Sequence, residues 1–400
     1  MNQPIGLGVI GMGRAFTLML PTLTADPRIR LIAAHDPRPS ACLAFQETLG
    51  GTACQRPEEV CAHPDVEWVY IASPHAMHVD HVLLAAHYGK HVLVEKPMAL
   101  NMADCEAMIK ACQKAGIHLV VGHSHSFDAP VRLAQQLIAS GQWGRVRMIQ
   151  ALQYTDFLYR PRRPEELQTA LGGGVVFSQA AHQVDVVRLL AGTPARSVRA
   201  ITGSWDARRP TEGAYSALLS FDDGAWANLT YSGYGFFDTD VWMNGVGELG
   251  TPKSPLAHSA TRRKHAQMKD EAAEAQAKAE RNFGGRDYAG IDTVAPTHYQ
   301  HFGPVIVSCE NADLQLLPNG VMVMDASGAE LHGLPPPTMA RQEVVDEIWA
   351  AARLGQAPQH DGQWSMATLE VCLALLQSST LGQDIILRAQ TTPPAHDVQN

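Results

Sequence analysis

The chain has 400 residues, of which 46% are hydrophobic and 18% charged, and its formal net charge is −9. This length exceeds one ordinary hydrophobic core, so we expect two globular domains. The acidic balance argues against nucleic acid or an anionic membrane surface as the main partner. No apolar run approaches the ~20 residues of a membrane span, and no signal peptide opens the sequence. The seven cysteines include no Cys-x-x-Cys pair, which is typical of free thiols in a reducing compartment, and we expect a cytoplasmic protein.

Up to about residue 122 the sequence alternates short apolar runs with helical patterns. We expect strands at Ile5–Ile10, Ile29–Ala34, Trp68–Ile71, His91–Val94 and His118–Val121. We expect helices at Phe16–Ala25, Pro39–Leu49, His78–Tyr88 and Ala103–Ala115. Strands rich in Val, Ile and Leu between helices indicate a doubly wound parallel sheet, an α/β Rossmann domain over residues 1–125. In such a sheet, ligands bind at the carboxyl ends of the strands.

The first expected strand ends in a glycine-rich turn. Gly11 permits the tight turn, and Gly13 lets the backbone approach a pyrophosphate held by the free N–H groups of the next helix. Asp36 lies 23 residues after Gly13, where an acid bonds the adenosine ribose. A purely structural turn is the alternative, because Phe16 stands where the third glycine of the fingerprint would be. The cofactor contacts expected here are Gly11, Met12, Gly13, Arg14, Ala15, Asp36 and Arg38.

The same region indicates which nicotinamide cofactor is used. Asp36 would bond a free ribose 2′-hydroxyl and repel a 2′-phosphate, which favours NAD over NADP. Arg38 leaves NADP open, because its side chain would either shield that phosphate or stack on adenine.

Two later strand ends reach the same edge of the sheet. Ser73 and Pro74 follow the Trp68–Ile71 strand, and with His78 we expect them to line the cofactor cleft. Glu95 and Lys96 follow the next strand, which places both at the cofactor and Lys96 beside the nicotinamide. A lysine there can bond a reacting oxygen and move its proton, and burial would lower its pKa towards neutrality. The alternative is an ordinary lysine paired with Glu95.

Histidines recur near these strand ends. His75, His78 and His81 repeat every third residue, and His123 and His125 flank one serine. The first three spread around a helix, and no carboxylate or cysteine completes a ligand set, so we expect no metal.

Residues 126–390 are expected to form an α+β domain with an open, mostly antiparallel sheet, because hairpin turns separate consecutive strands. The expected strands are Val146–Phe157, Val198–Ser204, Tyr215–Phe221, Ala225–Tyr234, Val305–Glu310, Asp313–Leu317 and Val321–Ala326. The expected helices are Val131–Ala139, Ser178–Leu190, Arg341–Leu354 and Ser365–Ser379. Thr261–Arg281, rich in Ala, Glu, Lys and Arg, predicts a solvated helix or a mobile insertion between strands. We expect the tail from Gln390 to fray.

Three arginines follow the first of these strands. Arg160, Arg162 and Arg163, stiffened by Pro161 and Pro164, could grip substrate carboxylates with bidentate forks. A solvated basic loop is the alternative.

A glycine run at residues 172–174 precedes a helix that carries Ser178, His182 and Asp185. Spacings of four and three residues put these side chains on one side of the helix. Histidine, with an ordinary pKa of ~6.5, is a natural proton acceptor. We expect His182 to be catalytic, and Ser178 and Asp185 to orient it or to bind substrate. The alternative is a core-facing histidine paired for stability.

Taken together, the glycine turn, Asp36, Ser73-Pro74, Glu95-Lys96-Pro97 and the helix of His182 resemble the glucose-fructose oxidoreductase / inositol dehydrogenase (Gfo/Idh/MocA) family, from residue 4 to about residue 390. The resemblance implies a Rossmann domain, then a domain whose open sheet packs against another subunit in a homodimer or homotetramer. It also implies hydride transfer to a nicotinamide, with Lys96 and His182 in the active site. Many members carry an aspartate where this chain has Ser178.

Within that family, Phe157 to Arg163, the segment from residue 172 to Asp185, and Tyr231 to Tyr234 resemble phthalate cis-dihydrodiol dehydrogenases. This resemblance implies NAD-dependent oxidation of a cyclic diol bearing carboxylates to the corresponding catechol, with the arginines as anchors. Two alternatives stay open, a sugar or inositol dehydrogenase and a non-enzymatic nucleotide-sensing regulator.

Overall fold

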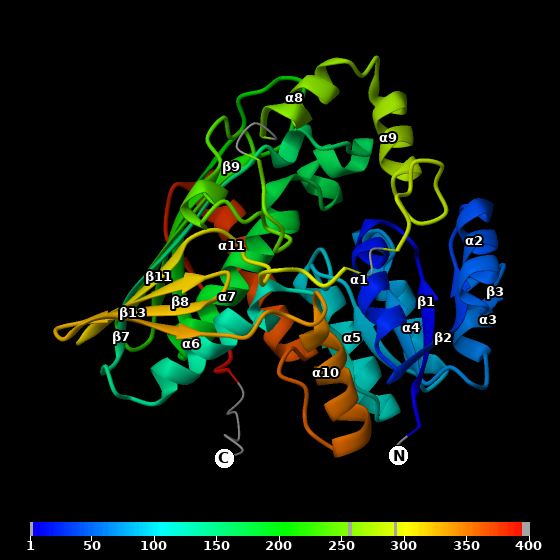
Figure 1. Cartoon of the computed structure of the whole chain (residues 1–400), viewed down its shortest axis with the longest axis horizontal. Helices are drawn as coiled ribbons and strands as arrows, with labels where there is room; N and C mark the ends of the chain where they lie inside the picture. The colour runs from blue at the N-terminus through cyan, green and yellow to red at the C-terminus, as the bar shows by residue number, and fades with distance from the viewer. Residues whose placement is uncertain (1–2, 255–257, 292–293, 394–400) are drawn as a thin grey trace.

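The computed structural model describes residues 3–254, 258–291 and 294–393, which form two lobes joined by helices (Figure 1). The N-terminal lobe holds a six-stranded sheet of order β3-β2-β1-β4-β5-β6. Its strands are β1 Ile5–Ile10, β2 Ile29–His35, β3 Thr52–Ala53, β4 Trp68–Ile71, β5 His91–Val94 and β6 Leu119–Val121. Its helices are α1 Arg14–Ala25, α2 Pro39–Leu49, α3 Pro57–Ala62, α4 His78–His87 and α5 Met102–Ala115.

This lobe confirms the predicted Rossmann architecture. The central strand β1 pairs in parallel with β2 and β4, and all its residues are buried. Burial on both faces follows from helices that cover the two sides of the sheet. Only β3 and α3 were not predicted, because two and six residues are too few to show a periodic pattern.

The C-terminal lobe holds a nine-stranded sheet of order β14-β13-β12-β11-β7-β10-β9-β8-β15. The pairing is antiparallel except between β7 and β10, as predicted for an open, mostly antiparallel sheet. The strands are β7 Val146–Tyr154, β8 Ala195–Gly203, β9 Ala214–Phe221, β10 Trp226–Ser232, β11 Val305–Cys309, β12 Ala312–Leu317, β13 Gly320–Asp325, β14 Gly328–Gly333 and β15 Ile385–Ile386. The unpredicted β14 and β15 are an exposed edge strand and a two-residue strand.

Helices cover one face of this sheet, the face towards the N-terminal lobe (Figure 1). They are α6 Ala129–Ala139, α7 Ala181–Ala191 and α11 Gly362–Leu381. The other face carries exposed apolar side chains, among them Ile201, Leu218 and Trp226. Alternate residues of each strand therefore point to a buried core and to an uncovered surface.

Helix α10, Gln342–Trp349, returns the chain to the N-terminal lobe. Its Val344, Val345 and Ile348 are fully buried in the same core as β1. The domain boundary between residues 125 and 126 stays a prediction. Helix α10 lies after that boundary in the chain, yet it packs in the core of the N-terminal lobe.

The segment between β10 and β11 departs from the prediction of a solvated helix or mobile insertion. It forms two helices, α8 His258–Ala266 and α9 Glu271–Glu280, which reach from the C-terminal lobe towards α1 and α2 (Figure 1). Glu274 in α9 is buried and bonds Arg209 with both carboxylate oxygens, at 2.9 and 3.0 Å. The alternation of charged and small residues suggested a solvated face, but a buried ion pair fixes this helix in place.

The tail begins in contact with the C-terminal lobe rather than frayed. The Gln390 amide donates to the carbonyl of Ala367 at 2.8 Å and accepts from Arg188 at 3.0 Å. The rest of the predicted frayed tail, residues 394–400, lies outside the described residues. Among the described helices, none is both long and apolar enough to cross a membrane.

Candidate active site

The glycine turn after β1 is shaped to admit a phosphate. Gly11 has φ +90°, and a Cβ there would lie 2.7–2.8 Å from backbone atoms of Ala72 and Ser73, so only glycine fits. Gly13 is the N-cap of α1, and a Cβ there would meet only one atom, at 4.0 Å. The space beside the free N–H groups of α1 is therefore open, as a bound pyrophosphate requires. Phe16 is fully buried in the core of this lobe, which accounts for the missing third glycine.

Asp36 and Arg38 form one unit at the end of β2. The Asp36 carboxylate accepts from the Met12 N–H at 2.7 Å and from Arg38 Nε at 2.9 Å. Arg38 also donates to the carbonyls of Met12, Ala279 and Phe283. The charge of Arg38 is thus directed at protein acceptors.

The loops after β4 and β5 are joined by a buried histidine. The two ring nitrogens of His78 lie 3.0 Å from the carbonyls of Ser73 and Pro97. Burial lowers the pKa of His78 to about 4, although both carbonyls act to raise it. His78 links the two loops that carry Ser73-Pro74 and Lys96, and its direct contact with a cofactor stays a prediction.

Lys96 lies at the carboxyl end of β5, as predicted. Its ammonium Nζ donates to the main-chain carbonyl of Ser178 at 2.7 Å. Burial lowers the pKa of Lys96 to about 8. The neighbouring Glu95 accepts a hydrogen bond from Tyr70 at 2.6 Å, and burial raises the pKa of Glu95. Glu95 is thus hydrogen-bonded to Tyr70, and Lys96 to the carbonyl of Ser178, although the charge of Glu95 still acts on Lys96.

His182 lies one turn beyond the carbonyl that Lys96 contacts. Burial lowers the pKa of His182 well below its ordinary value, and the charge of Lys96 lowers it further. Its Nδ1 is buried and has no hydrogen-bond partner among the described residues. The structure therefore brings a neutral imidazole and an amine of near-neutral pKa together between the lobes, from residues 86 positions apart.

The helix that carries His182 differs from the prediction in one respect. Residues Val176–Ala180 form a π-helical turn before α7, which holds an extra residue and changes the register. The Ser178 hydroxyl bonds the carbonyl of Gly174, so the carbonyl of Ser178, and not its side chain, meets Lys96.

Asp185 does not orient His182. Its carboxylate accepts hydrogen bonds from Ser126 and, at 2.9 Å, from Thr368 of α11. A small pocket behind α7 is lined by Asp185 together with Lys96 and Ser124. His182 and Asp185 both lie in the regular helix α7, so the π-helical turn changes only the position of Ser178 relative to them. The carboxylate of Asp185 is directed to Ser126 and to α11 rather than to His182, and a role of Asp185 in substrate binding stays a prediction.

Three residues beside His182 were not predicted as site residues. The His125 and His182 rings lie edge to face, with centroids 4.8 Å apart. Asp128 bonds His125 Nδ1 at 2.6 Å and His123 Nε2 at 3.1 Å. Although burial acts to raise it, these two imidazoles lower the pKa of Asp128 to about 2. Asp128 thereby fixes the orientation of the imidazole that packs against His182.

This cluster corrects the expectation that no carboxylate completes a set of histidines. His123, His125 and Asp128 each offer one metal-ligating atom, and these atoms lie within 4.8 Å of one another. The same atoms already bond one another, and the charges of Lys96 and Arg341 act on the neighbouring His182, so the surroundings favour an oriented imidazole over a cation. The pattern His-x-His-x-x-Asp after the last parallel strand was the signal available in the sequence.

A row of aromatic rings leads away from His182. Its ring centroid lies 5.2 Å from Phe302, which stacks on Tyr231 at 5.9 Å. Tyr231 meets Phe157 edge to face at 6.4 Å, and the Arg162 guanidinium lies 3.6 Å from the Phe157 ring centroid. These contacts form a continuous path from His182 to Arg162, and aromatic faces of this kind favour a planar ring as their partner.

Comparisons with known proteins agree with this arrangement. The family model described as an oxidoreductase family with an NAD-binding Rossmann fold matches residues 5–123, and the GFO/IDH/MocA C-terminal domain matches residues 131–253. The chain is 46% identical over 375 residues to 1-carboxy-3-chloro-3,4-dihydroxycyclohexa-1,5-diene dehydrogenase of Comamonas testosteroni, across 93% of this chain and 94% of that protein. The chain belongs to the Gfo/Idh/MocA oxidoreductase family.

Solved structures share this fold. A dehydrogenase from Bordetella bronchiseptica RB50, described as putative, has a TM-score of 0.90 at 37% identity and covers 96% of this chain and 100% of its own. The WlbA dehydrogenase from Bordetella pertussis, solved with NADH and UDP-GlcNAcA, has a TM-score of 0.70 at 20% identity, covers 97% of this chain and 99% of its own, and shares the fold. The protein is thus an oxidoreductase with an NAD-binding Rossmann domain.

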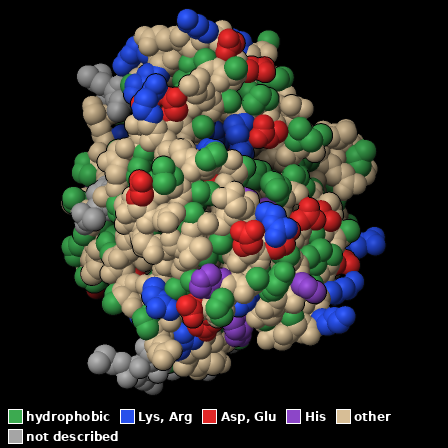
Figure 2. All heavy atoms as spheres, turned by 90° about the vertical axis from the view of Figure 1, so that its right-hand side faces the viewer, with side chains coloured by type: hydrophobic (Ala, Val, Ile, Leu, Met, Phe, Trp, Pro, Cys, Tyr) green, Lys and Arg blue, Asp and Glu red, His purple; other side chains and the backbone are tan. Residues whose placement is uncertain are grey.

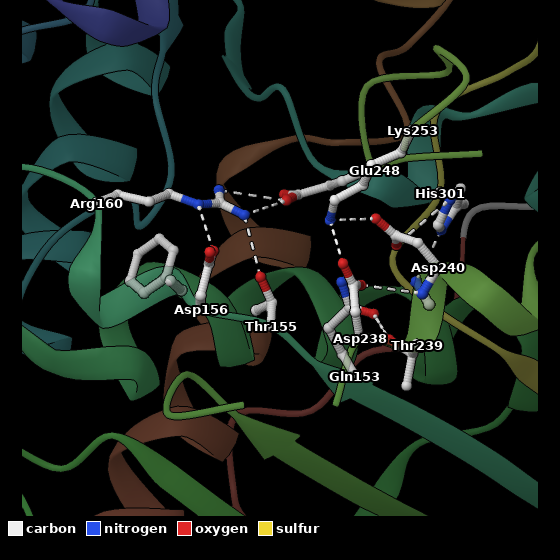
Figure 3. A network of polar contacts seen from close by, with 12 residues as sticks. Gln153, Thr155, Asp156, Arg160, Asp238, Thr239, Asp240, Glu248, Lys253 and His301 are labelled. Carbon is white, nitrogen blue, oxygen red and sulfur yellow. Dashed lines mark hydrogen bonds and ion pairs between the residues drawn. The ribbon is translucent and has the colours of Figure 1, made fainter. Parts of the chain in front are cut away.

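In this Gfo/Idh/MocA oxidoreductase the three predicted arginines have different surroundings. Figure 3 shows Arg160 directed towards Asp156, Thr155 and Glu248. Its guanidinium lies 3.1 Å from the Thr155 hydroxyl and 3.4 Å from the Glu248 carboxylate. Arg163 pairs with Glu165 at 2.9 Å and with Glu166. Both guanidiniums therefore already have carboxylate partners.

Arg162 is different, because its guanidinium bonds only one main-chain carbonyl, that of Phe157 at 2.7 Å. Its Nε is buried and has no hydrogen-bond partner within the described part of the chain. Of the three arginines, Arg162 is the one whose guanidinium has no carboxylate partner among the described residues.

Proposed function

We propose that this enzyme oxidises a carboxylated cyclohexadiene cis-diol to the corresponding catechol with NAD, the substrate being an aromatic-acid dihydrodiol of the phthalate type. One observation carries the proposal: a row of aromatic rings connects the buried His182 to the guanidinium of Arg162. The relative from Comamonas testosteroni, whose name specifies a carboxylated cyclohexadiene diol, supports the same substrate class.

The two buried bases divide the proton chemistry of this reaction. The glycine turn and Asp36 would hold NAD, which would supply the acceptor for the hydride of the carbinol carbon. The amine of Lys96 takes the hydroxyl proton at Nζ, which the low pKa of this amine permits near neutral pH. The neutral imidazole of His182 bonds the same oxygen and keeps it aligned. The ketone formed tautomerises to a catechol, and the regained aromaticity favours oxidation.

The contacts of Asp36 support NAD as the cofactor. A 2′-phosphate at this position would meet a carboxylate, while Arg38 is engaged by that carboxylate and by main-chain carbonyls. We also place the enzyme in the cytoplasm, where its free cysteines, seven in the described residues, would stay reduced.

A panel of diols with both cofactors tests this function. We expect NADH formation with carboxylated cyclohexadiene cis-diols, a KM for NADP at least ~10-fold above that for NAD, and inhibition by phthalate. Sugars and inositols serve as the comparison substrates. Turnover of a sugar or of inositol without inhibition by phthalate would replace this proposal by a polyol dehydrogenase. The lack of turnover with every substrate would favour a nucleotide-sensing regulator.

We further propose that the uncovered face of the large sheet joins subunits in a homodimer or homotetramer. Leu218 and Ile306 belong to one row across β9, β10, β7 and β11, and both side chains are exposed, by 46% and 39%. The two residues between them in this row, Asn228 and Gln150, are uncharged. Exposed apolar side chains on an uncovered sheet face, without charges between them, are typical of a protein interface.

Light scattering after gel filtration tests the assembly. The mass is expected to be two or four times the 43.3 kDa of one chain, and the double variant Leu218→Glu/Ile306→Glu is expected to reduce it to one chain. The matched control is Leu83→Glu on α4, at another exposed leucine. A wild-type protein with the mass of one chain would contradict the proposal.

A further inference from the structure

The end of α9 lies against the N-terminal lobe next to the glycine turn. The Phe283 ring packs edge to face on Phe16 with centroids 5.4 Å apart, and the Phe283 N–H donates to Thr17 Oγ1 at 3.0 Å. Arg38 reaches the carbonyls of Ala279 and Phe283. Residues 279–283 therefore lie on the first turn of α1, which begins at Arg14.

The preceding turns of α9 bind the loop that carries the predicted arginines. The carboxylate of Glu274 accepts from the main-chain N–H of Arg162 at 2.8 Å, besides its two bonds to Arg209. Lys278 forms an ion pair with Glu166 of the same loop. Because α9 is bonded to this loop and its end to α1, Arg281 lies in the stretch of chain that joins the loop of Arg162 to the first turn of α1, where Arg14 is.

The positive charges gathered here lack acceptors. Among the described residues, the side chains of Arg14 and Arg281 make no hydrogen bond or ion pair, and the Nε atoms of Arg162 and Arg281 are buried without a partner. Burial, followed by the charges of Arg14 and Arg162, lowers the pKa of Arg281 to about 10. On the surface seen in Figure 2, by contrast, basic side chains are interspersed with acidic ones. Partly buried guanidiniums that repel one another are stabilised by an anion between them.

We propose that Arg281, from the segment between β10 and β11, completes an anion site with Arg14 and Arg162 that binds a carboxylate of the substrate. The inference rests on the proposed function for the identity of the anion. A planar guanidinium matches a carboxylate with two parallel hydrogen bonds. The site adjoins the aromatic row through Arg162 and Phe157, so a carboxylate bound there places the attached ring along the row towards His182. The cofactor diphosphate has its own donors in the free N–H groups of α1.

Binding of phthalate, an unreactive aromatic dicarboxylate, tests this site without relying on turnover. In the presence of NAD, calorimetry is expected to give the Arg281→Met variant a Kd for phthalate ~10- to 100-fold above that of the wild type. Arg281→Lys keeps the charge but not the fork and is expected to lie between the two. The Kd for NADH, from cofactor fluorescence, stays within about twofold in both variants if the donors of α1 hold the diphosphate. The matched control is Arg286→Met, in an exposed ion pair a few residues along the same segment.

The outcomes separate the site from the function. An unchanged Kd for phthalate in Arg281→Met, or a wild-type enzyme that does not bind phthalate, would overturn the proposed site. A raised Kd for NADH with unchanged binding of phthalate would assign the anion to the cofactor diphosphate and overturn it as well. Binding of phthalate that depends on Arg281, in an enzyme that turns over no diol, would support the site while contradicting the proposed function.

Discussion

Replacing Lys96 with methionine is expected to lower kcat for diol oxidation by about a thousandfold, within the range known for positioned acid–base groups. The methionine fills a similar volume but cannot take the hydroxyl proton. The Kd for NADH is expected to change little, because the glycine turn and Asp36 supply the contacts expected for the cofactor. Stopped-flow measurement of NADH formation gives kcat, and cofactor fluorescence gives the Kd.

Lys110→Met is the matched control, since Lys110 is an exposed lysine on α5 that pairs only with Glu106. It should leave both constants at wild-type values. Turnover of Lys96→Met within about tenfold of the wild type would remove Lys96 from the proton transfer.

The pH dependence of the same reaction separates two roles of Lys96. Burial lowers its pKa to about 8, so the fraction of neutral amine rises as the pH increases through that value. If the neutral amine is the base, kcat/KM for oxidation rises with pH and levels off above about 8, and Lys96→Met loses this limb. A profile that falls through the same region would instead make the ammonium form active, with His182 as the base.

Replacing His182 with asparagine is expected to lower kcat about a hundredfold. Asparagine retains a hydrogen-bonding group but neither the reach nor the basicity of an imidazole. His182 contacts Phe302 and His125, so KM is also expected to rise, because the ring forms part of the wall for the substrate. Steady-state kinetics over the diol concentration separates the two constants.

The comparison variant is His87→Asn, at an exposed histidine near the end of α4, which should behave as wild type. A His182→Asn enzyme with normal kcat and a raised KM would show that the imidazole only shapes the pocket. Lys96 would then carry the proton transfer without it.

Local patterns predicted most of the fold. The strands β1, β4 and β5 and the helix α2 have the predicted bounds. Their bounds could be predicted because they depend on short apolar runs and on the few residues that flank them. The segment of α8 and α9 was misjudged, since the burial of Glu274 depends on Arg209, a residue 65 positions away.

The candidate site was predicted only in part, because local patterns again do not show contacts between distant residues. Lys96 was found because the carboxyl ends of parallel strands meet at one edge, a rule that needs only the order of elements. His125 followed from the same rule applied to β6, and it was overlooked. The contacts of Asp185 could not be predicted, because its partners Ser126 and Thr368 lie 59 and 183 positions away in the chain.

The sequence by itself determined the order of strands and helices, the turn at Gly11 and Gly13, and the placement of Lys96 at a strand end, because these depend on backbone conformation and apolar spacing over short stretches. Only the tertiary structure decided that Arg160 pairs with Glu248, that Asp185 bonds Thr368 of α11, and that the end of α9 packs on the first turn of α1. These partners are far apart in the chain, and the packing of the two lobes decides which of them meet.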